Sequence, residues 1–199
     1  MRLGLRLFLG FFLITGLTAF FLLRVFLAEV KPSVREVMED IMVDSANLLA
    51  ELAQDDLAAL APGADLTGSR FAERVQAYAQ RPVDAQIWGL RKQSLDFRIY
   101  VTDAKGRVLL DTGAKPAVGQ DYSQWRDVAL ALRGEYGARS SRIVETDDRS
   151  SVMYVAAPVR QGGQVIGVVT VAKPLATVQG FIDRAERRIL LAGLLLLLA

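Results

Sequence analysis

Seven side chains between residues 98 and 173 have the types and spacing expected of a site for a small anion. Along 97–102 apolar residues alternate with polar ones, so Arg98 and Tyr100 share one face of a predicted strand. A guanidinium group beside aromatic rings suits a carboxylate, because it offers paired N–H donors next to an apolar surface. We therefore predict a ligand-binding set of Arg98, Tyr100, Trp125, Arg126, Arg139, Tyr154 and Lys173.

Several of these residues also have a purely structural interpretation. Trp125 can fill the core, Arg98 can pair with a nearby aspartate, and Lys173 can mark the end of a strand. Strands this rich in apolar residues can also leave no cavity, in which case the domain would sense a partner protein instead of a small molecule.

The absence of histidine and cysteine from the sequence restricts the chemistry that the chain can perform. No Ser-His-Asp or Cys-His nucleophile can be built, and no zinc site of the usual type. The P-loop, the H-E-x-x-H motif and the G-x-G-x-x-G motif are also missing. We therefore expect no catalytic residue, no metal site and no cofactor in this chain.

The candidate residues are positioned by a predicted sheet made mainly of two hairpins. Each hairpin has a glycine-containing turn, at Gly106 and at Gly162-Gly163, between β-branched runs. The five predicted strands are 97–102, 107–110, 140–145, 151–159 and 165–172. With a long helix before the sheet and another helix after it, this order predicts an α+β domain with a five-stranded antiparallel sheet.

The segment 120–136 links the two hairpins and contains a short predicted helix, which Ser123 begins and Gly134 ends. Laid over the open face of the sheet, this segment would form a pocket with Trp125 and Arg126 in its lid. The residues 67–78 and 83–92 read as two further short helices.

The long helix is predicted over 31–61. Its apolar residues recur at steps of three and four, with Ser45 filling one step: Val34, Met38, Ile41, Leu48 and Leu52. This repeat is typical of a coiled-coil seam between two copies of a chain. It is equally typical of one stripe buried on the domain's own sheet, against Phe97, Ile99 and Val101. Both interpretations can be true at different levels of the helix, with the turns near the membrane pairing between two copies and the far turns packing on the sheet.

Two apolar segments at the ends of the chain suggest membrane spans. The residues from Leu7 to Leu23 carry no charge, and 7–28 is long enough for an uncleaved transmembrane helix, with a cleaved signal peptide as the alternative. Arg2 and Arg6 then place residues 1–6 in the cytoplasm and 31–187 outside it. The run 189–199 reaches about halfway across a bilayer. We interpret it as the truncated start of a second transmembrane helix in a piece of a longer protein.

The charge of the outer region argues against a nucleic-acid partner. The whole chain has a formal net charge of +2, but 31–187 contains 20 basic and 21 acidic residues. The basic excess therefore belongs to the membrane flanks, and no electrostatic footprint for nucleic acid is present.

Five stretches of sequence carry a family resemblance: VTDAKGRVLLD, VGQDYSQW, LRGEYGARS, SSVMYVAAPV and GVVTVAKP. In this order they resemble the extracytoplasmic PAS-like sensor domain, also called PDC or single Cache. The agreement is with the CreC-type sensor histidine kinases of bacterial two-component systems, and it extends over nearly the whole chain. The resemblance implies an inner-membrane receptor with 31–187 in the periplasm, and a cytoplasmic kinase half that acts on a response regulator.

A helical pattern continues from Leu175 toward the second apolar segment, so a shift in the domain can be passed across the membrane. We therefore expect the membrane-signalling region of a homodimeric sensor histidine kinase that responds to a small, possibly anionic, ligand or to a periplasmic protein. This piece is itself no kinase, since it lacks the phospho-accepting histidine. The alternatives are the same sensor on a chemoreceptor or a cyclic-dinucleotide enzyme, or a membrane-anchored binding or chaperone protein.

Overall fold

The computed structural model describes residues 3–87, 89–147, 150–177, 179–180, 182–184, 187–189 and 191. The chain divides into two compact units, residues 1–37 with 178–199, and residues 38–177. The long helix α1 (Leu3–Ala58) contributes to both units, and the sheet belongs wholly to the second one.

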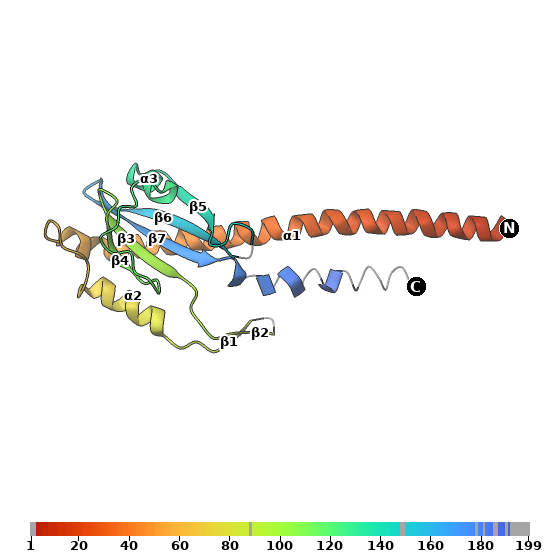
Figure 1. Cartoon of the computed structure of the whole chain (residues 1–199), viewed down its shortest axis with the longest axis horizontal. Helices are drawn as coiled ribbons and strands as arrows, with labels where there is room; N and C mark the ends of the chain where they lie inside the picture. Colours follow the sequence, from red (N-terminus) through yellow and green to blue (C-terminus); the bar gives the residue numbers. More distant parts are fainter. Residues whose placement is uncertain are drawn as a thin grey trace. The chain divides into compact units, whose positions relative to one another are not determined.

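The second unit is built on a five-stranded antiparallel sheet with the strand order β4-β3-β7-β6-β5 (Figure 1). Its strands are β3 (Arg98–Asp103), β4 (Val108–Asp111), β5 (Gly137–Arg142), β6 (Ser151–Gln161) and β7 (Gln164–Pro174). Gly106, Gly162 and Gly163 have positive φ angles at the two hairpin turns, as the sequence predicts. The predicted α+β class and the five antiparallel strands are therefore confirmed.

Two elements differ from the predictions. The fifth strand was predicted at 140–145, but β5 begins at Gly137 and the chain turns away after Arg142. The predicted helix over 83–92 is wrong, because β1 (Ala85–Ile87) and β2 (Leu90–Lys92) form a small separate hairpin there. Gly89, with φ 78°, makes the turn, and an ion pair between Arg91 and Asp84 closes it.

Two shorter helices complete the unit. Ser69 caps α2 (Arg70–Gln80) by accepting a hydrogen bond from the Ala72 backbone N–H at 3.1 Å. The helix α3 (Arg126–Leu132) lies in the segment between the two hairpins, and Gly134 follows it with φ 78°. The predicted cap at Ser123 is wrong, because Trp125 occupies the N-cap position and makes no side-chain capping bond.

The helix α1 buries a different stripe from the predicted one. The buried side chains are Met38, Met42, Ala46, Ala50, Ala53 and Leu57, of which only Met38 belongs to the predicted stripe. Ile41, Leu48 and Leu52 are 54%, 63% and 62% exposed. Leu57 at the end of this stripe meets the sheet: a Cβ atom added at Gly167 of β7 would lie only 2.4 Å from Leu57 Cδ2. The buried stripe therefore combines two methionines and a leucine with three alanines, and the predicted Ile41, Leu48 and Leu52 lie outside it.

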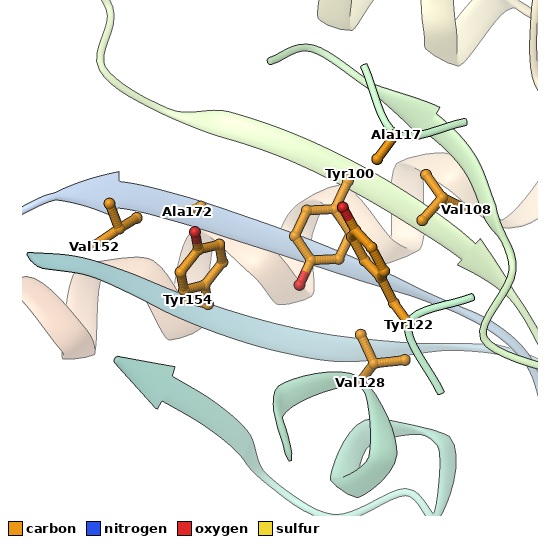
Figure 2. Packing of buried hydrophobic residues seen from close by; sticks show 8 residues of the cluster. All are labelled: Tyr100, Val108, Ala117, Tyr122, Val128, Val152, Tyr154 and Ala172. Carbon is orange, nitrogen blue, oxygen red and sulfur yellow. The ribbon is translucent and has the colours of Figure 1, made fainter. Parts of the chain in front are cut away.

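The two faces of the sheet have different neighbours. In Figure 2 α1 lies behind the sheet, and the labelled aromatic side chains lie in front of it. Ile99 on the rear face shares a groove with α1, which confirms that the apolar face of β3 meets the long helix. Tyr100 and Tyr154 point to the front face, toward Tyr122 and Val128.

In the first unit the N-terminal part of α1 exposes apolar side chains on all sides, among them Phe11, Leu13 and Phe21 at 69–71%. Searched over the described residues, no helix combines the length and the apolar character needed to cross a membrane. Of the predicted second span at 189–199, residues 190 and 192–199 lie outside the described residues.

Candidate functional site

Four aromatic rings meet on the front face of the sheet. Tyr100 and Tyr154 come from β3 and β6, and Tyr122 and Trp125 come from the segment that leads into α3 (Figure 2 shows the three tyrosines). The rings of Tyr122 and Trp125 stack with centroids 3.6 Å apart, and Tyr100 meets Tyr122 edge-on at 5.4 Å. Contacts of this kind add to the stability that the buried area supplies and fix the positions of the rings.

Arg139 on β5 lies over two of these rings. Its Cζ atom is 3.8 Å from the centroid of the Tyr154 ring and 4.3 Å from that of Trp125, both within the range of cation–π attraction. Its Nε donates to Asp127 Oδ1 at 2.7 Å and its Nη1 donates to Ser141 Oγ at 3.1 Å. The third nitrogen, Nη2, is buried and has no hydrogen-bond partner among the described residues.

Asp127, on the first turn of α3, joins this helix to the sheet. Its fully buried carboxylate accepts from Arg139 Nε and from the hydroxyl group of Tyr100. Burial and the charge of Asp127 raise the pKa of Tyr100 well above its ordinary value. Burial by itself would lower the pKa of Arg139. The hydrogen bond to Asp127 and the charge of that carboxylate have the larger combined effect, so the pKa of Arg139 is raised. The three groups therefore form a neutral phenol and a buried ion pair.

Arg98 has a separate partner at the edge of this cluster. Its Nε and Nη2 donate to the two carboxylate oxygens of Asp111 at 2.8 and 2.6 Å. Asp111 also accepts from the backbone N–H groups of Gly113 and Ala117, each at 2.9 Å. Burial alone would raise the pKa of Asp111, but these four donors lower it. The interpretation that Arg98 pairs with a nearby aspartate is thus confirmed.

Two of the predicted site residues lie apart from the cluster. Lys173 projects from the rear face of β7, where its Nζ lies 3.3 Å from Asp96 Oδ2 and 5.1 Å from the centroid of the Phe97 ring. Arg126 is exposed at the first residue of α3. The structure therefore brings together Arg98, Tyr100, Trp125, Arg139 and Tyr154, and their role in binding stays a prediction.

Sequence reasoning missed three residues of the cluster: Asp111, Tyr122 and Asp127. Asp127 precedes Val128 and lies four residues before Ala131, both buried, so helical periodicity gave a signal that it faces inward. Tyr122 follows a turn at Asp121 and lies three residues before Trp125, close enough for the two rings to meet.

A groove lies on the rear face of this unit. It has a volume of about 560 Å³ and lies between α1, α2 and the start of β3. Its apolar lining includes Leu48, Leu52, Phe71, Val75 and Phe97.

No known family model matches the chain. Sensor protein CreC of Escherichia coli (strain K12) is 48% identical over 197 residues, which cover 99% of this chain and 40% of that protein. The solved DcuS sensor domain of E. coli is 25% identical over 43% of this chain and 60% of that chain, with a TM-score of 0.35. The sensor domain of the Vibrio cholerae histidine kinase DctB is 14% identical over 79% and 59%, with a TM-score of 0.45.

The chain thus spans about two fifths of the length of the curated relative that it matches. The resemblance predicted from the five sequence stretches is confirmed. Over nearly its whole length, the chain is a relative of the CreC-type sensor proteins.

Proposed function

We propose that this chain is the extracytoplasmic signal-sensing region of a two-component sensor histidine kinase, with the PAS-like fold also called PDC or Cache. The observation that carries this proposal is the 48% identity to a sensor protein over 197 residues. Because the match covers 40% of that relative, the kinase activity and the response-regulator partner are proposed for the full-length protein.

The proposed membrane arrangement has one span at 7–28 and a second that begins at 189. Residues 1–6 are cytoplasmic, 31–187 are periplasmic, and two copies form a homodimer in the bacterial inner membrane. The uncharged run from Leu7 to Leu23 supports the first span, as do the apolar side chains exposed around it.

The proposed ligand is a small carboxylate that binds at the aromatic cluster beneath α3. The supporting observation is Arg139 Nη2, which is buried and lacks a partner in the described part of the chain. A carboxylate beside this nitrogen would gain a charge-assisted hydrogen bond that the domain does not supply. Since Asp127 already offsets the charge of Arg139, such a ligand competes with Asp127, and this competition would loosen α3 from the sheet.

The proposal is tested by the autophosphorylation rate of the full-length protein in membrane vesicles. The variant Arg139→Gln removes the charge that pairs with Asp127, so it is expected to change the basal rate at least threefold. The exposed neighbour Arg126→Gln serves as the control and keeps the wild-type rate. A folded Arg139→Gln protein with an unchanged rate would contradict coupling between this cluster and a kinase.

A further inference from the structure

We propose that Tyr136 and Glu39 form a latch that couples α3 to α1, so that a shift of α3 at the aromatic cluster changes how α1 is held. The inference rests on the proposed sensing function, because it names the contact through which a signal would pass from the cluster to the N-terminal helix. Tyr136 and Glu39 are positioning residues in this proposal, and neither is assigned a contact with the ligand.

Glu39 lies where α1 leaves the unit of residues 38–177. The helix is continuous from Leu3 to Ala58, and its residues up to Val37 belong to the other unit. Met38 is buried, and Glu39 beside it is half-buried. A contact at Glu39 therefore acts on the turn of α1 through which the helix passes from one unit to the other.

The latch is a hydrogen bond between residues far apart in the sequence. The Tyr136 hydroxyl group donates to Glu39 Oε1. Tyr136 directly precedes β5, which is an edge strand of the sheet, so its side chain can reach α1 beside the sheet. The buried stripe of α1 is apolar, and apolar contacts are non-directional. A hydrogen bond to a carboxylate adds a directional constraint on the rotation of α1 at this level.

The tyrosine side of the latch is fixed to α3. A Cβ atom added at Gly137, the residue after Tyr136, would lie only 2.1 Å from the backbone oxygen of Asp127, so β5 and α3 touch there without an intervening side chain. In the short connection before Tyr136, the Glu135 backbone N–H donates to the Leu130 oxygen at 3.0 Å. A displacement of α3 consequently moves Tyr136.

The aromatic cluster acts on the same helix from its other end. Arg139 holds α3 through Asp127, and the ligand proposed above competes with Asp127 for Arg139. Binding would thus release α3 and, through Tyr136, the hold on α1. A ligand selects between two such arrangements only by binding one of them better than the other.

The latch is well suited to opening without unfolding. Tyr136 is 53% exposed, so water can take over the hydrogen bond when it breaks, and the bond contributes little to stability. Variants that lack it are therefore expected to fold normally and to melt within 2 °C of the wild type.

Autophosphorylation of the full-length protein in membrane vesicles tests the latch. Tyr136→Phe and Glu39→Ala each remove the hydrogen bond, and each is expected to change the basal rate at least threefold, in the same direction as Arg139→Gln. Combining either variant with Arg139→Gln is expected to add less than 1.5-fold, because both changes act by opening one contact. Glu36→Ala, at an exposed glutamate of α1, is the matched control and keeps the wild-type rate.

A rescue variant separates the latch from a general effect of Tyr136. The extended lysine side chain is about as long as that of tyrosine, so Tyr136→Lys can pair with Glu39 and is expected to restore the rate to within 1.5-fold of the wild type. In the Glu39→Ala background the same lysine has no partner and restores nothing.

Two results would overturn the latch: wild-type rates in both Tyr136→Phe and Glu39→Ala, or a lysine variant that behaves like Tyr136→Phe. If either occurs while Arg139→Gln still alters the rate, the latch is refuted and the proposed sensing function stands. An unchanged rate in folded Arg139→Gln refutes instead the coupling of the cluster to the kinase.

Discussion

Replacing Asp127 by asparagine is expected to destabilise the unit of residues 38–177 more than any other single change at the cluster. The carboxylate is fully buried and holds both Arg139 Nε and the Tyr100 hydroxyl. Without it the Arg139 guanidinium, whose side chain is 18% exposed, loses its counter-charge in a largely buried place. Breaking a buried ion pair by removing one partner costs about 3–5 kcal/mol.

The lower end of this range applies here, because two aromatic rings and Ser141 continue to stabilise the guanidinium. A loss of about 3 kcal/mol in a domain of this size lowers Tm by about 9 °C. Circular dichroism melting of the 199-residue chain in detergent at pH 7 measures this shift. Tyr100→Phe removes only one hydrogen bond to the same carboxylate and is expected to cost about half as much.

Asp40→Asn provides the control, because Asp40 is exposed on α1 and its replacement is expected to change the stability by less than about 0.5 kcal/mol. The reasoning is refuted if Asp127→Asn melts within 2 °C of the wild type, or if Tyr100→Phe costs more than Asp127→Asn. In either case the ion pair with Arg139 would not be what fastens α3 to the sheet.

Two further predictions concern acid stability and backbone packing. Because the folded pKa of Asp111 lies below its ordinary value of 3.8, Asp111 contributes stability that is present above that pH and lost as the pH falls through the folded pKa. Urea titrations between pH 5 and pH 2 are expected to show a weaker acid dependence in Asp111→Asn than in the wild type, and equal slopes would contradict the assigned role. Gly137→Ala would place a Cβ atom 2.1 Å from the backbone oxygen of Asp127, so we expect a fall in Tm of more than 5 °C, whereas Gly63→Ala, in open space at positive φ, is expected to cost about 1 kcal/mol. Similar melting of the two glycine variants would show that α3 can shift away from β5 at little cost.

The sheet could be predicted from the sequence because its strands alternate or form β-branched runs, and its turns contain glycine where φ is positive. The hairpin at 85–92 could not, since its strands have three residues each, which is too short for an alternating pattern to distinguish a strand from a helix. The features that mark this segment as a hairpin are the turn at Gly89 and the ion pair between Arg91 and Asp84.

The buried stripe of α1 was mispredicted for a physical reason. Leucine and isoleucine dominate any hydropathy pattern, whereas Ala46, Ala50 and Ala53 become core residues only through tertiary packing. Leu57 on the same stripe meets Gly167 in β7, which is more than a hundred residues away in the sequence. The exposed large residues retain the heptad spacing, so the coiled-coil interpretation stays a prediction.

The site residues on the strands could be predicted from the sequence, whereas those on α3 and the segment before it were predicted less completely. Strand alternation correctly placed Arg98 and Tyr100 on one face, since side chains two residues apart on a strand share a side. Asp127 was missed because a charged residue in a short helix is ordinarily solvent-exposed. Its burial depends on Arg139, which reaches it from a strand that follows the helix in the chain.

The location of the domain outside the cytoplasmic membrane is tested most directly by labelling single cysteines in intact cells. A membrane-impermeant maleimide small enough to reach the periplasm is added before and after permeabilisation of the inner membrane. Lys105→Cys, in an exposed turn of the sheet, is predicted to react fully before permeabilisation, and Arg6→Cys only afterwards. Protection of Lys105→Cys until the inner membrane is opened would contradict an extracytoplasmic sensor.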